Sequence, residues 1–164
     1  MSYKISSPNF LQYRPGVGLM IINKHHQIFV GRRIDLKRET WQMPQGGIEL
    51  GETPSRAALR EMEEEIGSKN ATIIAESVNW YSYDIPTAMI NKLWEGQYRG
   101  QTQKWFLIKF HGEDEDINLH FHEAEFSNWK WVDSNQLMRI IMPFKRKLYK
   151  LIISEFKKFI LDKK

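Results

Sequence analysis

The stretch WQMPQGGIELGETPSRAALREMEEEIG, residues 41–67, joins a glycine-containing loop to a dense group of glutamates. Four glutamates fall within five positions, at Glu61, Glu63, Glu64 and Glu65. Like charges three or four residues apart on a helix repel, at a cost of about 0.2–0.5 kcal/mol per pair. Such clustering therefore requires a physical reason.

The glutamates are predicted to lie on a helix that begins after Thr53. Thr53 is a good N-cap, Pro54 suits the first helical position, and Gly67 suits the position just past the C-terminus. On a helical wheel, three carboxylates lie within an arc of about 100°: Glu61, Glu64 and Glu65. The small Ala57 lies on the same side. A separate stripe is expected to be buried: Leu59, Met62 and Ile66. Glu63 points elsewhere.

Two interpretations of this acidic face remain open from the carboxylates alone. It can be a solvated surface, since glutamate is a good helix former. It can instead bind a divalent cation, because several carboxylate oxygens suit Mg²⁺ or Mn²⁺. Glu64 and Glu65 lie late in the helix, where the helix dipole disfavours negative charge, and this counts against a purely structural acidic face.

The whole chain indicates one soluble domain, residues 1–164. Hydrophobic residues make up 41% of it, enough for a core, and the absence of cysteine excludes disulfides and thiolate chemistry. No apolar run is long enough for a membrane span, so we expect a cytoplasmic protein without a membrane partner. Residues 1–11 are expected to be a flexible N-terminus. The basic segment 144–161 follows helical spacing and is predicted to be a C-terminal helix.

Strand-like runs surround the first helix. They are the runs at 17–24 and 27–33 with a hairpin turn at 24–26, and those at 71–85, 104–110 and 129–132. Residues 86–100 and 111–126 are interpreted as loops. Strands mixed with one central and one terminal helix predict an α/β (or α+β) sandwich, in which a mixed sheet is covered on both faces.

The loop and helix together resemble the Nudix box, the signature of hydrolases that act on nucleoside diphosphates linked to another group. The pattern is Gly46, five residues, Glu52, seven residues, then REMEEEIG at 60–67. Every fixed position matches, except that Ser68 follows where the family favours an aliphatic residue. The resemblance implies an α/β/α Nudix fold and dependence on Mg²⁺ or Mn²⁺.

The resemblance also implies roles for individual residues. Glu61, Glu64 and Glu65 would hold metal ions and act in catalysis, and Glu125 would join them. The general base is left open between Glu61 and Glu125. The structural part of the box comprises Gly46, Glu52, Arg60 and Gly67, in which Glu52 and Arg60 pair. Gly46 and Gly47 allow close approach of the backbone to substrate.

Other segments resemble the bacterial RNA pyrophosphohydrolases, a group also described as dinucleoside polyphosphate hydrolases. They include YRPGVGLMIIN at 13–23, GQTQKWFLI at 100–108 and PFKRKLY at 143–149. The likeness implies removal of pyrophosphate from 5′-triphosphorylated or 5′-diphosphorylated RNA, or cleavage of diadenosine tetraphosphate to ATP and AMP. The implied substrate contacts are Arg14, Arg33, Thr40, Gln45, Gly46, Tyr83, Lys104, Phe144 and Lys145.

These residue types suit such a substrate, because cations bind phosphates and aromatic rings stack on unpaired bases. An alternative of another class is a nucleotide- or RNA-binding module that has lost catalysis, but the intact carboxylate set argues against it. The tryptophans are interpreted as core residues, and His120 and His122 as surface residues. An activator protein, the number of metals and the oligomeric state stay open.

Overall fold

The computed structural model describes residues 11–36 and 38–161. Its strands are β1 (Gln12–Ile22), β2 (Ile28–Arg33), β3 (Trp41–Gln42), β4 (Gln45–Gly47), β5 (Ala71–Glu76), β6 (Tyr81–Asp84), β7 (Tyr98–Phe110) and β8 (Phe126–Val132). Its α-helices are α1 (Pro54–Ile66), α2 (Thr87–Ile90), α3 (Ser134–Ile140) and α4 (Arg146–Leu161). Single 3₁₀ turns lie at Trp94–Gly96, Asp114–Asp116 and Pro143–Lys145.

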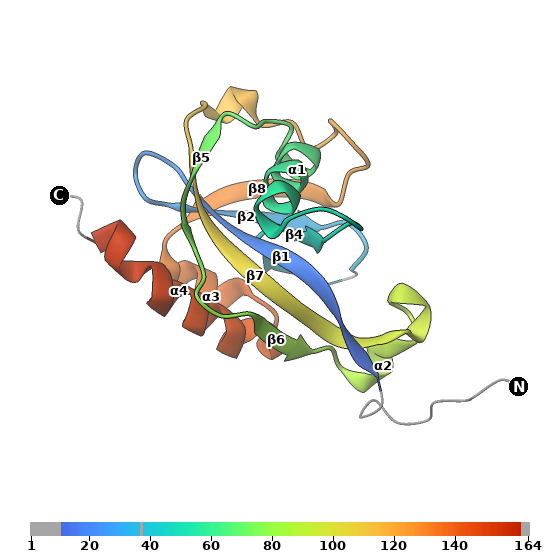
Figure 1. Ribbon diagram of the computed structural model, residues 1–164. Helices are drawn as coiled ribbons and strands as arrows, with labels where there is room; N and C mark the ends of the chain where they lie inside the picture. The colour runs from blue at the N-terminus through green and yellow to red at the C-terminus, as the bar shows by residue number, and fades with distance from the viewer. Residues whose placement is uncertain (1–10, 37, 162–164) are drawn as a thin grey trace, which may run out of the picture.

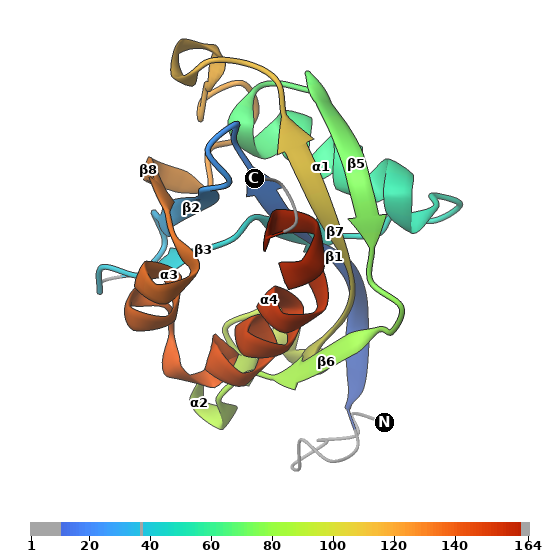
Figure 2. The same cartoon turned by 90° about the vertical axis from the view of Figure 1, so that its left-hand side faces the viewer.

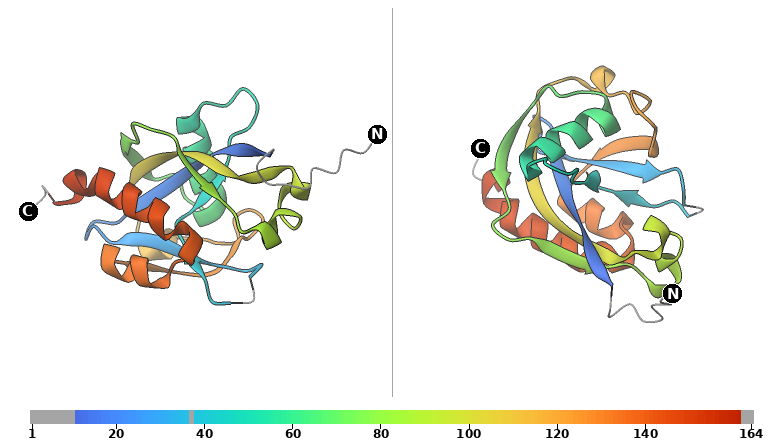
Figure 3. Two further views of the ribbon diagram at one scale, coloured as in Figure 1. Left: turned by 90° about the horizontal axis from the view of Figure 1, so that it is seen from below. Right: turned by 45° about the vertical axis from the view of Figure 1, so that its right-hand side comes forward.

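The strands form one mixed sheet with the path β3-β2-β1-β7-β5, to which β4, β6 and β8 add by pairing with β1, β7 and β2. The long central pair β1 and β7 is parallel, from Gln12 opposite Tyr98 to Ile22 opposite Lys109. The other pairings are antiparallel. Figures 1 and 3 show β1 and β7 running side by side through the middle of the molecule.

Helices cover both faces of the sheet. Alternate residues of a strand point to opposite faces, so Val17 and Leu19 of β1 pack with α1, while Met20 and Ile22 pack in the cluster that contains α3 and α4. Figure 2 shows α3 and α4 in front of the sheet and α1 behind it. The predicted sandwich with a mixed sheet is confirmed.

The ends of α1 are as predicted. The hydroxyl of Thr53 accepts a hydrogen bond from the Arg56 amide at 3.3 Å, and Pro54 opens the helix. Gly67 ends it with φ 76°, and its N–H donates to the Glu63 carbonyl at 2.9 Å. A positive φ of this kind favours glycine, which has no Cβ to clash.

The burial of α1 differs from the expected pattern in two respects. Leu59, assigned to the buried stripe, is 36% exposed, whereas Met62 and Ile66 are fully buried. Glu61 and Glu65 are only 8% and 5% exposed. The helix therefore turns its carboxylate face toward the rest of the protein, because the glycine loop before it leaves room for these side chains.

The strand ends also differ. The first strand begins at Gln12 rather than at residue 17, because β7 provides a parallel partner for the preceding residues. The run 71–85 is interrupted and forms β5 and β6, and the predicted loop 86–100 contains α2 and the start of β7. Helix α3 was not predicted, although Asp133 and Gln136 form a capping box, which is a sequence signal for the start of a helix.

The terminal segments agree in part with expectation. Helix α4 follows a 3₁₀ turn at 143–145 and buries Leu148, Ile152 and Phe156, while Leu151 is 46% exposed. The predicted flexible segment falls mostly outside the described residues, and Leu11, its last residue, packs half-buried against the core. His120 and His122 are exposed, as expected. No helix in the described ranges has the length and apolarity that a membrane crossing requires.

Candidate active site

The carboxylates of α1 are buried in a way that ordinary surface glutamates are not. Burial raises the pKa of Glu61 to about 7, although Arg60 opposes the shift. Burial also raises the pKa of Glu65 well above its usual value, and the neighbouring Glu125 adds to this. Neither carboxylate oxygen of Glu65 has a hydrogen-bond partner among the described residues. An unsatisfied buried carboxylate is costly, which makes Glu65 a candidate ligand for a bound cation.

Arg60 ties the glycine loop to the carboxylate helix. Its Nε donates to Glu52 Oε2 at 2.7 Å, and a terminal nitrogen donates to the Gly47 carbonyl at 2.8 Å. Another terminal nitrogen lies 2.9 Å from Glu61 Oε1 and 3.2 Å from Glu64 Oε2. The pairing of Arg60 with Glu52 that the resemblance implied is therefore present, and it fixes loop against helix.

Two glycines of the loop lie against charged side chains. A Cβ on residue 46 would lie 1.9 Å from Cδ of Glu61 and within 2.3 Å of both its oxygens. A Cβ on residue 47 would lie 2.3 Å from a terminal nitrogen of Arg14. Glycine is therefore required at both positions for the side chains to occupy their places.

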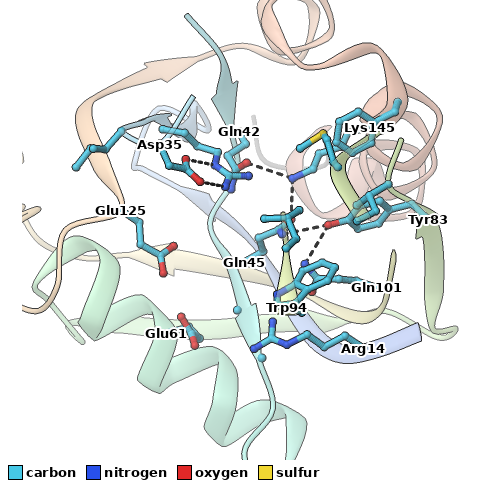
Figure 4. Close-up of a pocket in the computed structure, with 18 of the residues that line it drawn as sticks. Arg14, Asp35, Gln42, Gln45, Glu61, Tyr83, Trp94, Gln101, Glu125 and Lys145 are labelled. Atoms are coloured by element: carbon cyan, nitrogen blue, oxygen red, sulfur yellow. Dashed lines mark hydrogen bonds and ion pairs between the residues drawn. The ribbon is translucent and has the colours of Figure 1, made fainter. Parts of the chain in front are cut away.

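A cavity of ≈ 410 Å³ opens beside this loop (Figure 4). Most of the expected site residues line it: Arg14, Arg33, Gln45, Gly46, Glu61, Tyr83, Glu125, Phe144 and Lys145. Glu61 from α1 and Glu125 from the loop before β8 form one side, and Tyr83 and Lys145 lie on the other. The cavity thus places acidic groups opposite basic and aromatic groups.

The remaining expected residues lie elsewhere. Glu64 and Glu65 do not line the cavity: the Glu64 side chain is partly exposed on α1 and Glu65 is buried. Thr40 does not line it either; its hydroxyl is buried without a partner among the described residues, and its carbonyl accepts from the Arg33 amide. Lys104 donates to the Val78 carbonyl at 3.1 Å, away from the cavity.

Sequence reasoning missed several residues that line the cavity. They include Asp35, Gln42, Trp94 and Gln101. Trp94 was interpreted as core, yet its ring lies 5.5 Å from the Arg14 guanidinium, a cation–π arrangement. Asp35 accepts from Arg33 Nε at 2.9 Å. Asp35 could have been suggested by its spacing two residues after Arg33, whereas the others carry no local signal.

Lys145 lines the cavity and is almost fully buried. Its Nζ donates to Gln42 Oε1 at 3.2 Å and to Gln45 Oε1 at 3.0 Å. Burial lowers its pKa to about 7, and Arg33 adds to this shift, while Glu65 and Asp35 oppose it. The lysine is therefore held by two amide oxygens rather than by a carboxylate.

We expect this buried lysine to make the protein more stable as the pH rises from 7 to 9. Its folded-state pKa is lowered, so above pH 7 the unfolded chain binds more protons than the folded one, and the free energy of unfolding rises. At 1.36 kcal/mol per unit, the gain is about 2 kcal/mol over this interval. Urea unfolding of the wild type and of Lys145→Met at pH 7, 8 and 9 measures this gain. The difference between their free energies of unfolding should change by that amount from pH 7 to pH 9.

The exposed Lys147→Met is the matched control. A wild-type minus Lys145→Met difference that stays constant over this pH range would contradict the assignment of the shift to Lys145.

Comparison with known proteins identifies the family. The sequence profile of the NUDIX domain matches residues 12–152. The chain belongs to the Nudix family. Two relatives named RNA pyrophosphohydrolase support this: one from Orientia tsutsugamushi (strain Boryong) is 60% identical, over 98% of this chain and 100% of the relative. One from Rickettsia prowazekii (strain Madrid E) is 59% identical, over 92% of this chain and 93% of the relative.

Solved structures share the Nudix fold at low identity. The E. coli dihydroneopterin triphosphate pyrophosphohydrolase superposes with a TM-score of 0.69 at 20% identity, over 88% of this chain and 99% of that one. A C. elegans Ap4A hydrolase complex gives a TM-score of 0.61 at 20% identity, with the same coverage. Nudix enzymes generally use a divalent metal, and the carboxylate helix is the part of this chain that suits one.

Proposed function

We propose that this Nudix protein is a metal-dependent hydrolase that removes pyrophosphate from 5′-triphosphorylated RNA, or phosphate from 5′-diphosphorylated RNA, and leaves a 5′-monophosphate. The cavity is the main support for this proposal, because glutamates, arginines, a lysine and aromatic rings line one space. Relatives that are about 60% identical to this chain over nearly their whole length are named RNA pyrophosphohydrolase. Their name supports the choice of substrate.

The chemistry of the carboxylates fits a hard divalent cation, which we propose to be Mg²⁺ or Mn²⁺. The two partnerless oxygens of Glu65 are the donors that most need a ligand, and Glu61 and Glu64 lie on the same face. As placed, no three acidic or histidine side chains in the described ranges gather closely enough to form a complete metal site. Arg60 is bonded to Glu61 and Glu64, so these carboxylates would turn from it to coordinate a cation.

Each side chain then has a distinct task. A bound divalent cation would neutralise phosphate oxygens and acidify a water molecule. Arg14 and Arg33 would hold the phosphate chain by charge-assisted hydrogen bonds. Glu61 and Glu125 are the two acidic Nudix candidates that line the cavity, so the proton of the attacking water would pass to one of them.

The proposal is tested by incubating the protein with Mg²⁺ and either 5′-triphosphate RNA or diadenosine tetraphosphate. We expect a higher kcat/KM for the RNA, with pyrophosphate and 5′-monophosphate RNA as products, and no turnover in excess chelator. A higher kcat/KM for diadenosine tetraphosphate, with ATP and AMP released, would favour the dinucleotide alternative. Binding of RNA without turnover under any divalent metal would favour the inactive binding module.

Phe144→Ala is expected to weaken RNA processing. The Phe144 ring lies half-buried in the cavity wall, 6.1 Å from the ring of Tyr83. Stacking of one base on an aromatic ring contributes roughly 1–3 kcal/mol, which corresponds to about 5- to 150-fold in kcat/KM. Steady-state kinetics on 5′-triphosphate RNA measures the effect, and the melting temperature reports whether the start of α4 is disturbed.

Phe121→Ala serves as the control, because Phe121 is 53% exposed and does not line the cavity. If Phe144→Ala folds normally and processes RNA like the wild type, no base stacks on this ring. If it loses only the cleavage of diadenosine tetraphosphate, the dinucleotide becomes the better substrate assignment.

A further inference from the structure

A chain of buried amide side chains runs from the core of the protein to the wall of the cavity. It begins at Trp105, whose indole Nε1 donates to Gln103 Oε1 at 3.1 Å. Gln103 Nε2 donates to Gln101 Oε1 at 3.3 Å, and Gln101 Nε2 donates to the Tyr83 hydroxyl at 3.1 Å. Trp105, Gln103 and Gln101 are at most 2% exposed. Such buried polar groups persist because each is satisfied by its neighbour.

The position of these residues follows from the sheet. Gln101, Gln103 and Trp105 alternate along β7 and therefore point to the same face. Tyr83 of the neighbouring strand β6 pairs directly with Gln101. The register of β6 against β7 thus delivers the chain of hydrogen bonds to the Tyr83 hydroxyl.

The direction of every hydrogen bond in this chain is determined by its first member. An indole nitrogen can only donate, so Gln103 must present its oxygen to Trp105. The nitrogen of Gln103 then faces Gln101, which must in turn present its own oxygen. The nitrogen of Gln101 is therefore left to donate to Tyr83. A rotated amide at either glutamine would set two donors, or two acceptors, against each other.

A second chain reaches Tyr83 from the opposite side with the same polarity. Lys145 Nζ donates to Gln45 Oε1 at 3.0 Å, and Gln45 Nε2 donates to the Tyr83 hydroxyl at 3.1 Å. An ammonium group has only donors, and a neutral amine keeps two N–H bonds, enough for both Gln42 and Gln45. The two chains therefore converge on one oxygen in either charge state of the lysine (Figure 4).

The Tyr83 oxygen thus accepts two hydrogen bonds, and its single proton is left to donate. No acceptor for that proton appears among the hydrogen bonds of the described residues, and Tyr83 lines the cavity. Burial raises the pKa of Tyr83 to about 12, so the proton is present at any working pH. Arg14, Arg33 and Lys145 line the same cavity, so the expected acceptor is an anionic phosphate oxygen.

We propose that Gln103 and Trp105 are positioning residues for substrate recognition, which fix the hydrogen-bond polarity so that Tyr83 presents its hydroxyl proton to a phosphate oxygen of the bound 5′ end. Neither residue touches the cavity; both act through Gln101. The inference rests on the proposed function for the identity of the substrate. Without Gln103, the Gln101 amide is free to rotate and take the Tyr83 proton for itself.

A double-mutant cycle between Gln103→Met and Tyr83→Phe tests this coupling. A hydrogen bond to a charged group supports a loss of about 10- to 150-fold in kcat/KM for Tyr83→Phe on 5′-triphosphate RNA. Gln103→Met should show part of that loss in the wild-type background and less than about a 2-fold change in the Tyr83→Phe background. Trp105→Phe, which removes the first donor of the chain, should repeat this pattern.

Tyr81→Phe is the matched control, since Tyr81 lies on the same strand but bonds Glu155 and does not line the cavity. Melting temperatures of all variants separate positioning from loss of stability. If Gln103→Met does not fold, Trp105→Phe takes its place in the double-mutant cycle with Tyr83→Phe. If Gln103→Met lowers kcat/KM by the same factor in the wild-type and Tyr83→Phe backgrounds, the inference is overturned. A purely structural effect of Gln103 would not depend on the Tyr83 hydroxyl.

Failure of the proposed function is distinguishable from failure of this inference. If the wild type prefers diadenosine tetraphosphate, the same cycle is run on that substrate, whose phosphate chain offers the same acceptor oxygens. An additive cycle in an active enzyme overturns the positioning role alone. A wild type that turns over neither substrate overturns the proposed function and this inference together.

Discussion

Glu65→Gln is expected to keep the fold and to lower kcat by more than about 100-fold. Residues that only orient metal ligands already contribute 10- to 100-fold to activity, and a direct ligand should exceed that. The Glu65 carboxylate accepts no hydrogen bond within the described part of the protein, so the substitution removes none there. Glu64→Gln should also lower kcat by orders of magnitude. Kinetics with saturating Mg²⁺ and thermal unfolding measure both effects.

Glu63→Gln provides the control on the same helix. Glu63 lies away from the buried carboxylates, with its nearest cation, Lys69, at 3.8 Å. The Glu63→Gln substitution removes one negative charge from α1 without changing a residue of the site, so turnover should stay near that of the wild type. Near-native turnover in Glu64→Gln or Glu65→Gln, or full activity in excess chelator, would falsify the metal assignment.

Gly46→Ala and Gly47→Ala should separate catalysis from binding at adjacent positions. The new methyl group at residue 46 would displace the Glu61 carboxylate, and a displacement of about 1 Å can cost 100-fold in rate. At residue 47 it would instead displace the Arg14 guanidinium. We therefore expect Gly46→Ala to lower kcat by about 100-fold, and Gly47→Ala mainly to raise KM for 5′-triphosphate RNA.

Both displaced groups are the ends of flexible side chains, so both variants should fold, which far-ultraviolet circular dichroism can check. The expected contrast disappears if Glu61 and Arg14 do not have separate roles. In that case the two variants would change kcat and KM in the same proportion.

The local part of the site was predictable from sequence. The caps of α1, the convergence of its carboxylates and the pairing of Arg60 with Glu52 all depend on residues close together in the chain. Their burial was not predictable, because the helical wheel describes only which side chains share a face. What covers that face is decided by the glycine loop and by Glu125, which lies far along the sequence.

The distant part of the site depended on strand register, which the sequence alone does not determine. Lys104 was expected at the substrate, but it lies between Gln103 and Trp105 on β7 and so points to the other face of the sheet. Gln101 reaches the cavity only through the pairing of β7 with β1 and β6. A shift of β7 by one residue would turn Lys104 toward the cavity face of the sheet and Gln101 away from it.

The parallel pairing of β1 with β7 also affects how the protein emerges from the ribosome. Gln12 pairs only after Tyr98 has been synthesised, and Ile22 only after Lys109, so at 5–20 residues per second this edge of the first strand lacks its partner for on the order of ten seconds. Helix α1 is synthesised in that interval and acquires its caps early. The strands β2 and β4, which pair with β1 along one edge, are made early, but the other edge of this apolar strand stays unpaired and aggregation-prone until β7 is synthesised. Chaperone demand should therefore be greatest between the synthesis of these two strands.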